Sequence, residues 1–153
     1  MEIRNAQNEI IFECKEDFRK VNFDDLDLSG AVLERANLEG VVWCGTKLKH
    51  ANLKGADFYW AILFTSDLSY ADLEEAQFRG ADLKEVNFQG ANLRKVNFGR
   101  DNLGGSTQLQ GANLDQADTT DANFVGAEYD DRTLFPSFFD PNKHGMVFRP
   151  IKE

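Results

Sequence analysis

The sequence repeats a large apolar residue every five positions over most of its length. Counting from Phe18 in steps of five, each of 18 successive positions up to Leu103 holds Leu, Phe or Trp. Two residues before this centre Ala is common, directly before it Asn or Asp, and two after it Gly, as in the segment ANLEG at residues 36–40. A period of five matches neither the helical period of 3.6 nor the strand period of 2.

This pattern predicts a chain in which a very short extended segment alternates with a corner. The centre and the Ala point inward and the Asn or Asp between them points outward, because successive side chains of extended backbone alternate. The Gly fits the φ > 0 position of a type II turn, which Gly adopts without steric cost. Coils of this kind stack by parallel pairing about 4.8 Å apart, so the sequence predicts an all-β solenoid.

The motif Ala-(Asn/Asp)-Leu-X-Gly, which recurs at residues 51–55, resembles the repeat of the pentapeptide-repeat family. The resemblance covers about residues 16–131 and is specific because the motif occurs in so many copies. It implies a right-handed quadrilateral parallel β-helix with about 20 residues per coil, stacked as in other solenoids. The end of the chain is similar to the tail of cyanobacterial members of the family.

The repeats divide the chain into three segments. Residues 1–15 are expected to form a strand-like cap, residues 16–131 the solenoid, and residues 132–153 an aromatic cap and tail. The spacing of six between Leu103 and Leu109 predicts a one-residue bulge near residues 104–111, either a tolerated defect or a kink that shapes a partner surface. The period then continues through Leu134. Residues 9–14 are expected to cover the first coil as a strand, and residues 140–145 to form at most one helical turn.

Composition narrows the function further. The net charge of −9 and the pI near 4.7 disfavour direct binding to nucleic acid. No apolar run approaches the roughly 18–20 residues of a membrane helix, and the start of the chain lacks the features of a signal peptide. Cys14 and Cys44 form neither a metal motif nor a disulfide framework. We therefore expect a cytoplasmic protein with reduced cysteines and no membrane contact.

No catalytic, cofactor-binding or metal-binding site is expected. His50 and His144 lie far apart, without other residues at the spacing of metal ligands. The serines have no nucleophile-elbow context, and Gly104–Gly105 precede no P-loop Lys. These patterns give no indication of an enzyme.

The candidate site is instead an apolar patch on the solenoid surface. Tyr59, Trp60, Ile62 and Phe64 all fall on outward positions, where other repeats mostly carry polar residues or Gly. Val42 is expected to stack one coil away from Ile62, and Tyr70 to lie further round the same coil. Such clusters mark binding sites, although the side chains could also lie flat and cover the core.

These features favour an interaction or scaffold protein with an unidentified protein partner. A homodimer formed through a solenoid end is one candidate assembly. The resemblance also implies an alternative, because some family members act as acidic mimics of DNA on DNA gyrase. Lys and Arg interrupt each expected outward face, which argues against a good mimic of a uniformly charged duplex.

Overall fold

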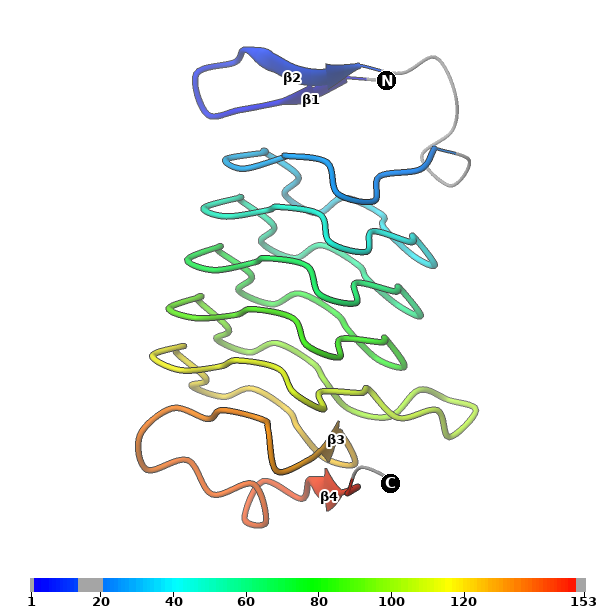
Figure 1. Ribbon diagram of the computed structural model, residues 1–153, viewed down its shortest axis with the longest axis vertical. Helices are drawn as coiled ribbons and strands as arrows, with labels where there is room; N and C mark the ends of the chain where they lie inside the picture. Colours follow the sequence, from blue (N-terminus) through cyan, green and yellow to red (C-terminus); the bar gives the residue numbers. More distant parts are fainter. Residues whose placement is uncertain (1, 14–20, 151–153) are drawn as a thin grey trace.

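The computed structural model describes residues 2–13 and 21–150. The first expected centre, Phe18, and the cysteine Cys14 lie outside these residues. No helix occurs among the described residues. The chain winds in coils stacked along the long axis of the molecule, with a hairpin at the N-terminal end (Figure 1).

Four short strands lie near the two ends of the stack. Strands β1 (Glu2–Arg4) and β2 (Ile10–Glu13) form the antiparallel hairpin. Strands β3 (Glu128–Tyr129) and β4 (Val147–Phe148) pair in parallel at the other end. Because the sequence between the hairpin and β3 turns a corner every five residues, its pairing is limited to isolated bridges.

These bridges define how the coils are stacked. From Asp27↔Lys47 to Gln77↔Asn97, each parallel bridge joins residues 20 apart. Each five-residue repeat therefore lies over the repeat four places later. Hydrogen bonds follow the same register: the amide of the centre Leu48 donates to the carbonyl oxygen of Asp67 at 2.7 Å.

The interior is filled by the centres and by the residues two places before them, which confirms this part of the sequence prediction. Every centre from Phe23 to Phe98 is buried, as are most of the Ala residues. Along one side, Phe rings stack on one another: the ring centroids of Phe58 and Phe78 are 4.7 Å apart, and those of Phe98 and Phe124 are 4.9 Å apart. These distances match the spacing of paired strands, about 4.8 Å.

The corners place the residue two after the centre at positive φ, whether or not it is Gly. Gly40 has a φ of 66°, as the sequence predicts, but Trp60 at the equivalent position has a φ of 56°. The Asn or Asp before the centre helps to close the corner. Its side-chain oxygen accepts a hydrogen bond from the amide two residues later, as Asp57 Oδ1 does from the Tyr59 N–H at 3.0 Å. Asx turns of this kind explain why these residue types recur at that position.

The irregularity after Phe98 is larger than predicted, and the expected one-residue bulge is wrong. Asp82 pairs with Gln108, so this bridge spans 26 residues instead of 20 and the coil contains six extra residues. Residues 101–106 leave the stack as a loop, seen as the yellow-green projection in Figure 1. Leu103 is 83% exposed and does not occupy a centre.

The loop is held by one carboxylate, and the stack resumes with a buried hydroxyl. Asp101 Oδ1 accepts hydrogen bonds from the amides of Leu103 at 2.8 Å and Gly105 at 2.6 Å. Thr107 then takes the inward position that Ala usually holds, and its hydroxyl donates to the carbonyl oxygen of Phe78 at 2.8 Å. Leu109 is the next buried centre.

A second shift, of one residue, precedes Leu134. The bridge Asn113↔Leu134 spans 21 residues, and Leu134 is 55% exposed, so the expected centre at this position is wrong. Thr133 points inward instead, and its hydroxyl donates to the Leu109 carbonyl at 3.0 Å. The extra residue lies in a turn where the buried carboxylate of Asp130 accepts the amide of Gly111 at 2.9 Å.

The hairpin covers the first described coil. Ile3 is buried, and the carbonyl of Arg4 accepts the amide of Val32 at 2.8 Å. The Phe12 ring centroid lies 4.9 Å from that of Phe23. Strand β2 falls within the segment expected to be a strand, and β1, which pairs with it, lies within residues 1–15, where the cap was expected.

Aromatic residues close the C-terminal end. The ring of Phe139 packs edge-on against Phe124, the last ring of the internal stack, with centroids 5.1 Å apart. Asp140 Oδ1 accepts the amide of Asn142 at 3.0 Å, and residues 141–145 form hydrogen-bonded turns without a helix. The chain then returns as β4 beside β3, which gives the last coil a further paired segment.

Candidate protein-binding surface

Outward residues of successive coils form columns, because bridged residues lie over one another. Most of these columns are polar ladders. Asn92 Nδ2 donates to Asp72 Oδ1 at 2.9 Å, and Asn123 Nδ2 donates to Asn97 Oδ1 at 3.0 Å. Such ladders satisfy the amide groups between coils and leave a hydrated surface.

One column departs from this pattern. Val42 and Ile62 bridge each other and are 47% and 40% exposed, so two branched apolar side chains lie side by side at the surface. The column becomes polar only at Asp82 and Gln108. This adjacency of Val42 and Ile62 was expected from the sequence.

Trp60 lies at the corner that precedes Ile62. Its indole Nε1 donates to Asp101 Oδ2 at 2.7 Å, yet half of the residue remains exposed. The indole passes over Gly80, where an added Cβ would lie 2.9 Å from Nε1. Tyr59 lies next to it, and the guanidinium of Arg79 lies 5.6 Å from the Tyr59 ring centroid.

The inserted loop adds Leu103 to this corner. A concavity of about 520 Å³, here called the Trp60 pocket, is lined by Leu103, Trp60, Tyr59, Glu39 and Gly40. Sequence reasoning missed both Leu103, which it assigned to the interior, and the role of Asp101. The polar residue Asp101 at a position usually held by Ala was the available signal.

Phe64 lies at the corner after Ile62 and is 41% exposed. The neighbouring Cys44 is a free thiol, and burial together with the nearby carboxylates of Asp24 and Asp82 raises its pKa. The structure thus brings together five exposed apolar residues, here called the Ile62 surface: Val42, Trp60, Ile62, Phe64 and Leu103.

Tyr70 does not belong to this surface. The column of Asp67 lies between Phe64 and the corner where Tyr70 is found. There the Tyr70 ring stacks on His50, with centroids 5.4 Å apart, and Lys49 Nζ lies 5.6 Å from the ring centroid. Tyr70 thus lies further round the same coil, as expected from the sequence, with a whole side of the coil between it and Ile62.

Several ion pairs join charges of opposite sign in successive coils. Lys54 Nζ lies 2.7 Å from Glu74 Oε2, and Arg94 lies 3.5 Å from Asp118. The hydrogen bond from Lys54 lowers the pKa of the Glu74 carboxyl and raises that of Lys54 itself. Around the Ile62 surface, Asp82 is instead paired within its own coil, with Lys84 Nζ at 3.1 Å.

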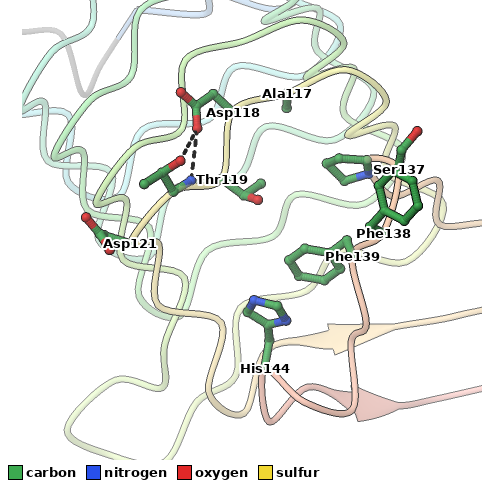
Figure 2. A pocket seen from close by; sticks show the side chains of 10 residues that line it. Ala117, Asp118, Thr119, Asp121, Ser137, Phe138, Phe139 and His144 are labelled. Atoms are coloured by element: carbon green, nitrogen blue, oxygen red, sulfur yellow. Dashed lines mark hydrogen bonds between the residues drawn. The ribbon is translucent and has the colours of Figure 1, made fainter.

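A second concavity, of about 410 Å³, lies at the C-terminal end (Figure 2). Its residues include Thr119, a polar residue at a centre position, and Phe138, which is fully exposed with a φ of 66°. His144 faces the ring of Phe139, with centroids 4.1 Å apart, and its Nδ1 lies 2.8 Å from the carbonyl oxygen of Asp140. The histidine thus contacts a ring and a carbonyl, not a nucleophile.

The carboxylate of Asp118 lines the C-terminal concavity. Hydrogen bonds from Thr120 hold the pKa of Asp118 below its usual value, so this carboxylate acts as an acceptor. Within residues 2–13 and 21–150, no three His, Cys, Asp or Glu side chains are grouped to hold a metal ion. The same residues include no helix with the length and hydrophobicity to cross a membrane.

Comparison with known proteins identifies the repeat. Eight copies of the Pentapeptide repeats family match residues 27–63, 65–100 and 106–128, which is well over half of the chain. The protein therefore belongs to the pentapeptide repeat family. The gap between the second and third matches coincides with the loop that leaves the stack.

Several solved structures are similar. Alr5209, a pentapeptide repeat protein from Nostoc PCC 7120, is 32% identical over 80% of this chain and 84% of its own, with a TM-score of 0.41. Rfr23, a pentapeptide repeat protein from the cyanobacterium Cyanothece 51142, is 26% identical over 73% of this chain and 89% of its own, with a TM-score of 0.34. QnrB1, a plasmid-mediated fluoroquinolone resistance protein, is 16% identical over 84% of this chain and 75% of its own, with a TM-score of 0.54. This similarity supports the β-helical solenoid fold alone. The chain matches none of the curated proteins.

Proposed function

We propose that this pentapeptide repeat protein is a non-catalytic interaction or scaffold protein that binds a partner protein through the Ile62 surface. The Val42–Ile62 pair carries the proposal. Where other columns place amide ladders, this column exposes two adjacent apolar side chains. Clustered exposed apolar residues mark interaction sites more than scattered ones do.

A role limited to covering the core accounts less well for the same residues. The Trp60 indole is held in place by Asp101, but half of it still faces solvent. Leu103 is 83% exposed and therefore covers very little. Aromatic residues that are fixed and exposed are suited to binding, because little conformational freedom remains to be lost.

Affinity capture from the source organism tests the proposal. The double variant Trp60→Ala/Phe64→Ser should lose more than tenfold in partner affinity, since one ring at a hot spot is worth about 2 kcal/mol and 1.4 kcal/mol is one decade. Tyr70→Ala is the matched control, because Tyr70 is 46% exposed but lies at another corner. Retention of every partner by the double variant, or equal losses with Tyr70→Ala, would refute the proposal.

We also propose that the coil is a right-handed quadrilateral and that the protein works in the cytoplasm without a cofactor. The 20-residue spacing of the bridges supports four five-residue sides per coil. The absence of a helical signal in far-ultraviolet circular dichroism is the expected result. A spectrum dominated by helix would contradict the fold.

An acidic mimic of DNA, acting on gyrase or another DNA-binding protein, is the second candidate. The net charge of −9 favours it. The ion pairs between coils count against it, because they place Lys and Arg among the acidic residues of the stack. Supercoiling assays should show weak or no inhibition by this protein. Potent inhibition that weakens as salt rises would establish mimicry instead, since screening reduces electrostatic attraction.

A further inference from the structure

The Trp60 pocket is bounded by two aromatic rings, one aliphatic side chain and one carboxylate. The ring centroids of Tyr59 and Trp60 are 6.3 Å apart and their planes are inclined by 49°. Leu103 and Glu39 complete the walls. At Gly40 no atom lies within 4 Å of the place that a Cβ would occupy, so the backbone there leaves open space.

The walls of this pocket are fixed before any ligand arrives. The carboxylate of Asp101, which is not the pocket carboxylate of Glu39, accepts hydrogen bonds from the Trp60 indole at 2.7 Å and from the Leu103 amide at 2.8 Å. Burial opposes ionisation of Asp101, but these bonds and that from Gly105 outweigh it and hold its pKa below the usual value. Asp101 therefore stays charged and sets the separation between the indole and the loop.

The chemistry of these walls favours a cation. Indole and phenol faces attract Lys and Arg, with Trp the strongest of the aromatic residues. The Tyr59 ring already attracts Arg79, whose guanidinium lies 5.6 Å away. Glu39 is the one charged side chain that lines the pocket, and it has no ion-pair partner among the described residues.

The geometry points to a cationic side chain of the partner protein, arginine above all, as the occupant of the Trp60 pocket. Its aliphatic stem packs against Leu103 and its guanidinium lies on the indole of Trp60 and pairs with Glu39. Arginine fits because it stacks on aromatic faces and pairs with carboxylates at the same time. The assignment rests on the proposed function and specifies the partner as a segment in which arginine is flanked by apolar residues that contact Val42 and Ile62.

Blocked pentapeptides of the sequence Ala-Leu-X-Leu-Ala, with Arg, Leu or Glu at X, provide the probe. Binding is followed by the indole N–H signals in nitrogen–proton correlation spectra. Trp43 is fully buried and serves as the internal reference for Trp60. The Arg peptide should shift the Trp60 signal and leave that of Trp43 unchanged, while the Glu peptide should shift neither.

Glu39→Gln is the decisive variant, because this exposed side chain can be replaced without disturbing the stack. Affinity for the Arg peptide should fall about tenfold in Glu39→Gln, as expected for a hydrogen bond between charged groups. It should also fall with rising salt. Equal binding of the Leu and Arg peptides, no effect of Glu39→Gln, or no shift of Trp60 with any peptide would each overturn the assignment.

Partner capture separates this inference from the proposed function. If Glu39→Gln retains the partner while Trp60→Ala/Phe64→Ser loses it, the Ile62 surface binds the partner but the pocket does not take a cation. If both variants retain the partner, the proposed function itself fails. Loss of the partner in both variants supports the two together.

Discussion

Replacing Leu103 with Ala, alongside the same change at Leu93, tests whether residues 101–106 leave the stack. Both leucines have the same place in the five-residue period. Leu93 is fully buried, and truncating a buried Leu to Ala costs about 2–5 kcal/mol. Leu103 is 83% exposed, so only about a sixth of its surface is removed from water. Since full burial of Leu is worth about 1.5–3 kcal/mol, its truncation should cost about 0.3–0.5 kcal/mol.

Thermal unfolding followed by circular dichroism distinguishes these costs. In a domain of about this size, 1 kcal/mol changes Tm by roughly 2–4 °C. Leu93→Ala should therefore lower Tm by at least about 4 °C, and Leu103→Ala by no more than about 2 °C. Equal effects would mean that Leu103 occupies a centre, and the six-residue loop would have to be abandoned in favour of a one-residue bulge.

Three further changes test other parts of the structure. Thr107→Val removes the hydroxyl that donates to the Phe78 carbonyl and leaves the Gly80 amide, which donates to that hydroxyl at 3.2 Å, without its acceptor. Urea denaturation should therefore show a loss of stability of about 1–3 kcal/mol, and an unchanged midpoint would contradict these contacts. Burial opposes ionisation of Asp130, but hydrogen bonds from Gly111 and its other partners outweigh it and hold the pKa below the ordinary 3.8. The stability that ionised Asp130 gives the folded state is therefore complete above pH 3.8 and is lost as the pH falls through the lower pKa of the folded protein. Asp130→Asn should reduce this acid sensitivity in melts at different pH. Gly80→Ala places a methyl group against the indole of Trp60 and a side chain at a φ of 72°, so the emission of Trp60 should change in a background where Trp43 is Phe. An unaltered spectrum would show that the indole lies elsewhere.

The regular coils could be predicted from the sequence because each repeat encodes its own geometry. The apolar centre, the small inward residue and the Gly at positive φ are all local, and repetition removes ambiguity about the register. The adjacency of Val42 and Ile62 followed directly. The position of Tyr70 further round the same coil followed in the same way.

The loop could not be predicted, because two registers satisfy the same spacing. Six residues separate Leu103 from Leu109, which fits a bulge, but eleven separate Phe98 from Leu109, which fits one repeat plus a six-residue loop. Thr107 stands two residues before Leu109 in both registers, so its inward hydroxyl, equivalent to those of Thr46 and Ser66, does not distinguish them. The bond from Trp60 to Asp101 joins residues 41 apart and becomes predictable only when the loop is known.

That bond has a consequence for how the rod unfolds. In an ideal solenoid each coil interacts only with its two neighbours, so stability can be written as a one-dimensional Ising chain and the ends fray one coil at a time. Trp60 and Asp101 belong to coils two apart, with the Gly80 corner between them. The hydrogen bond between Trp60 and Asp101 couples two coils that are not direct neighbours. Unfolding that starts at the C-terminal end therefore cannot proceed beyond the loop without also releasing the indole two coils away. Hydrogen exchange should therefore show the coils from Trp60 to Asp101 opening as one cooperative unit, with the terminal coils exchanging independently.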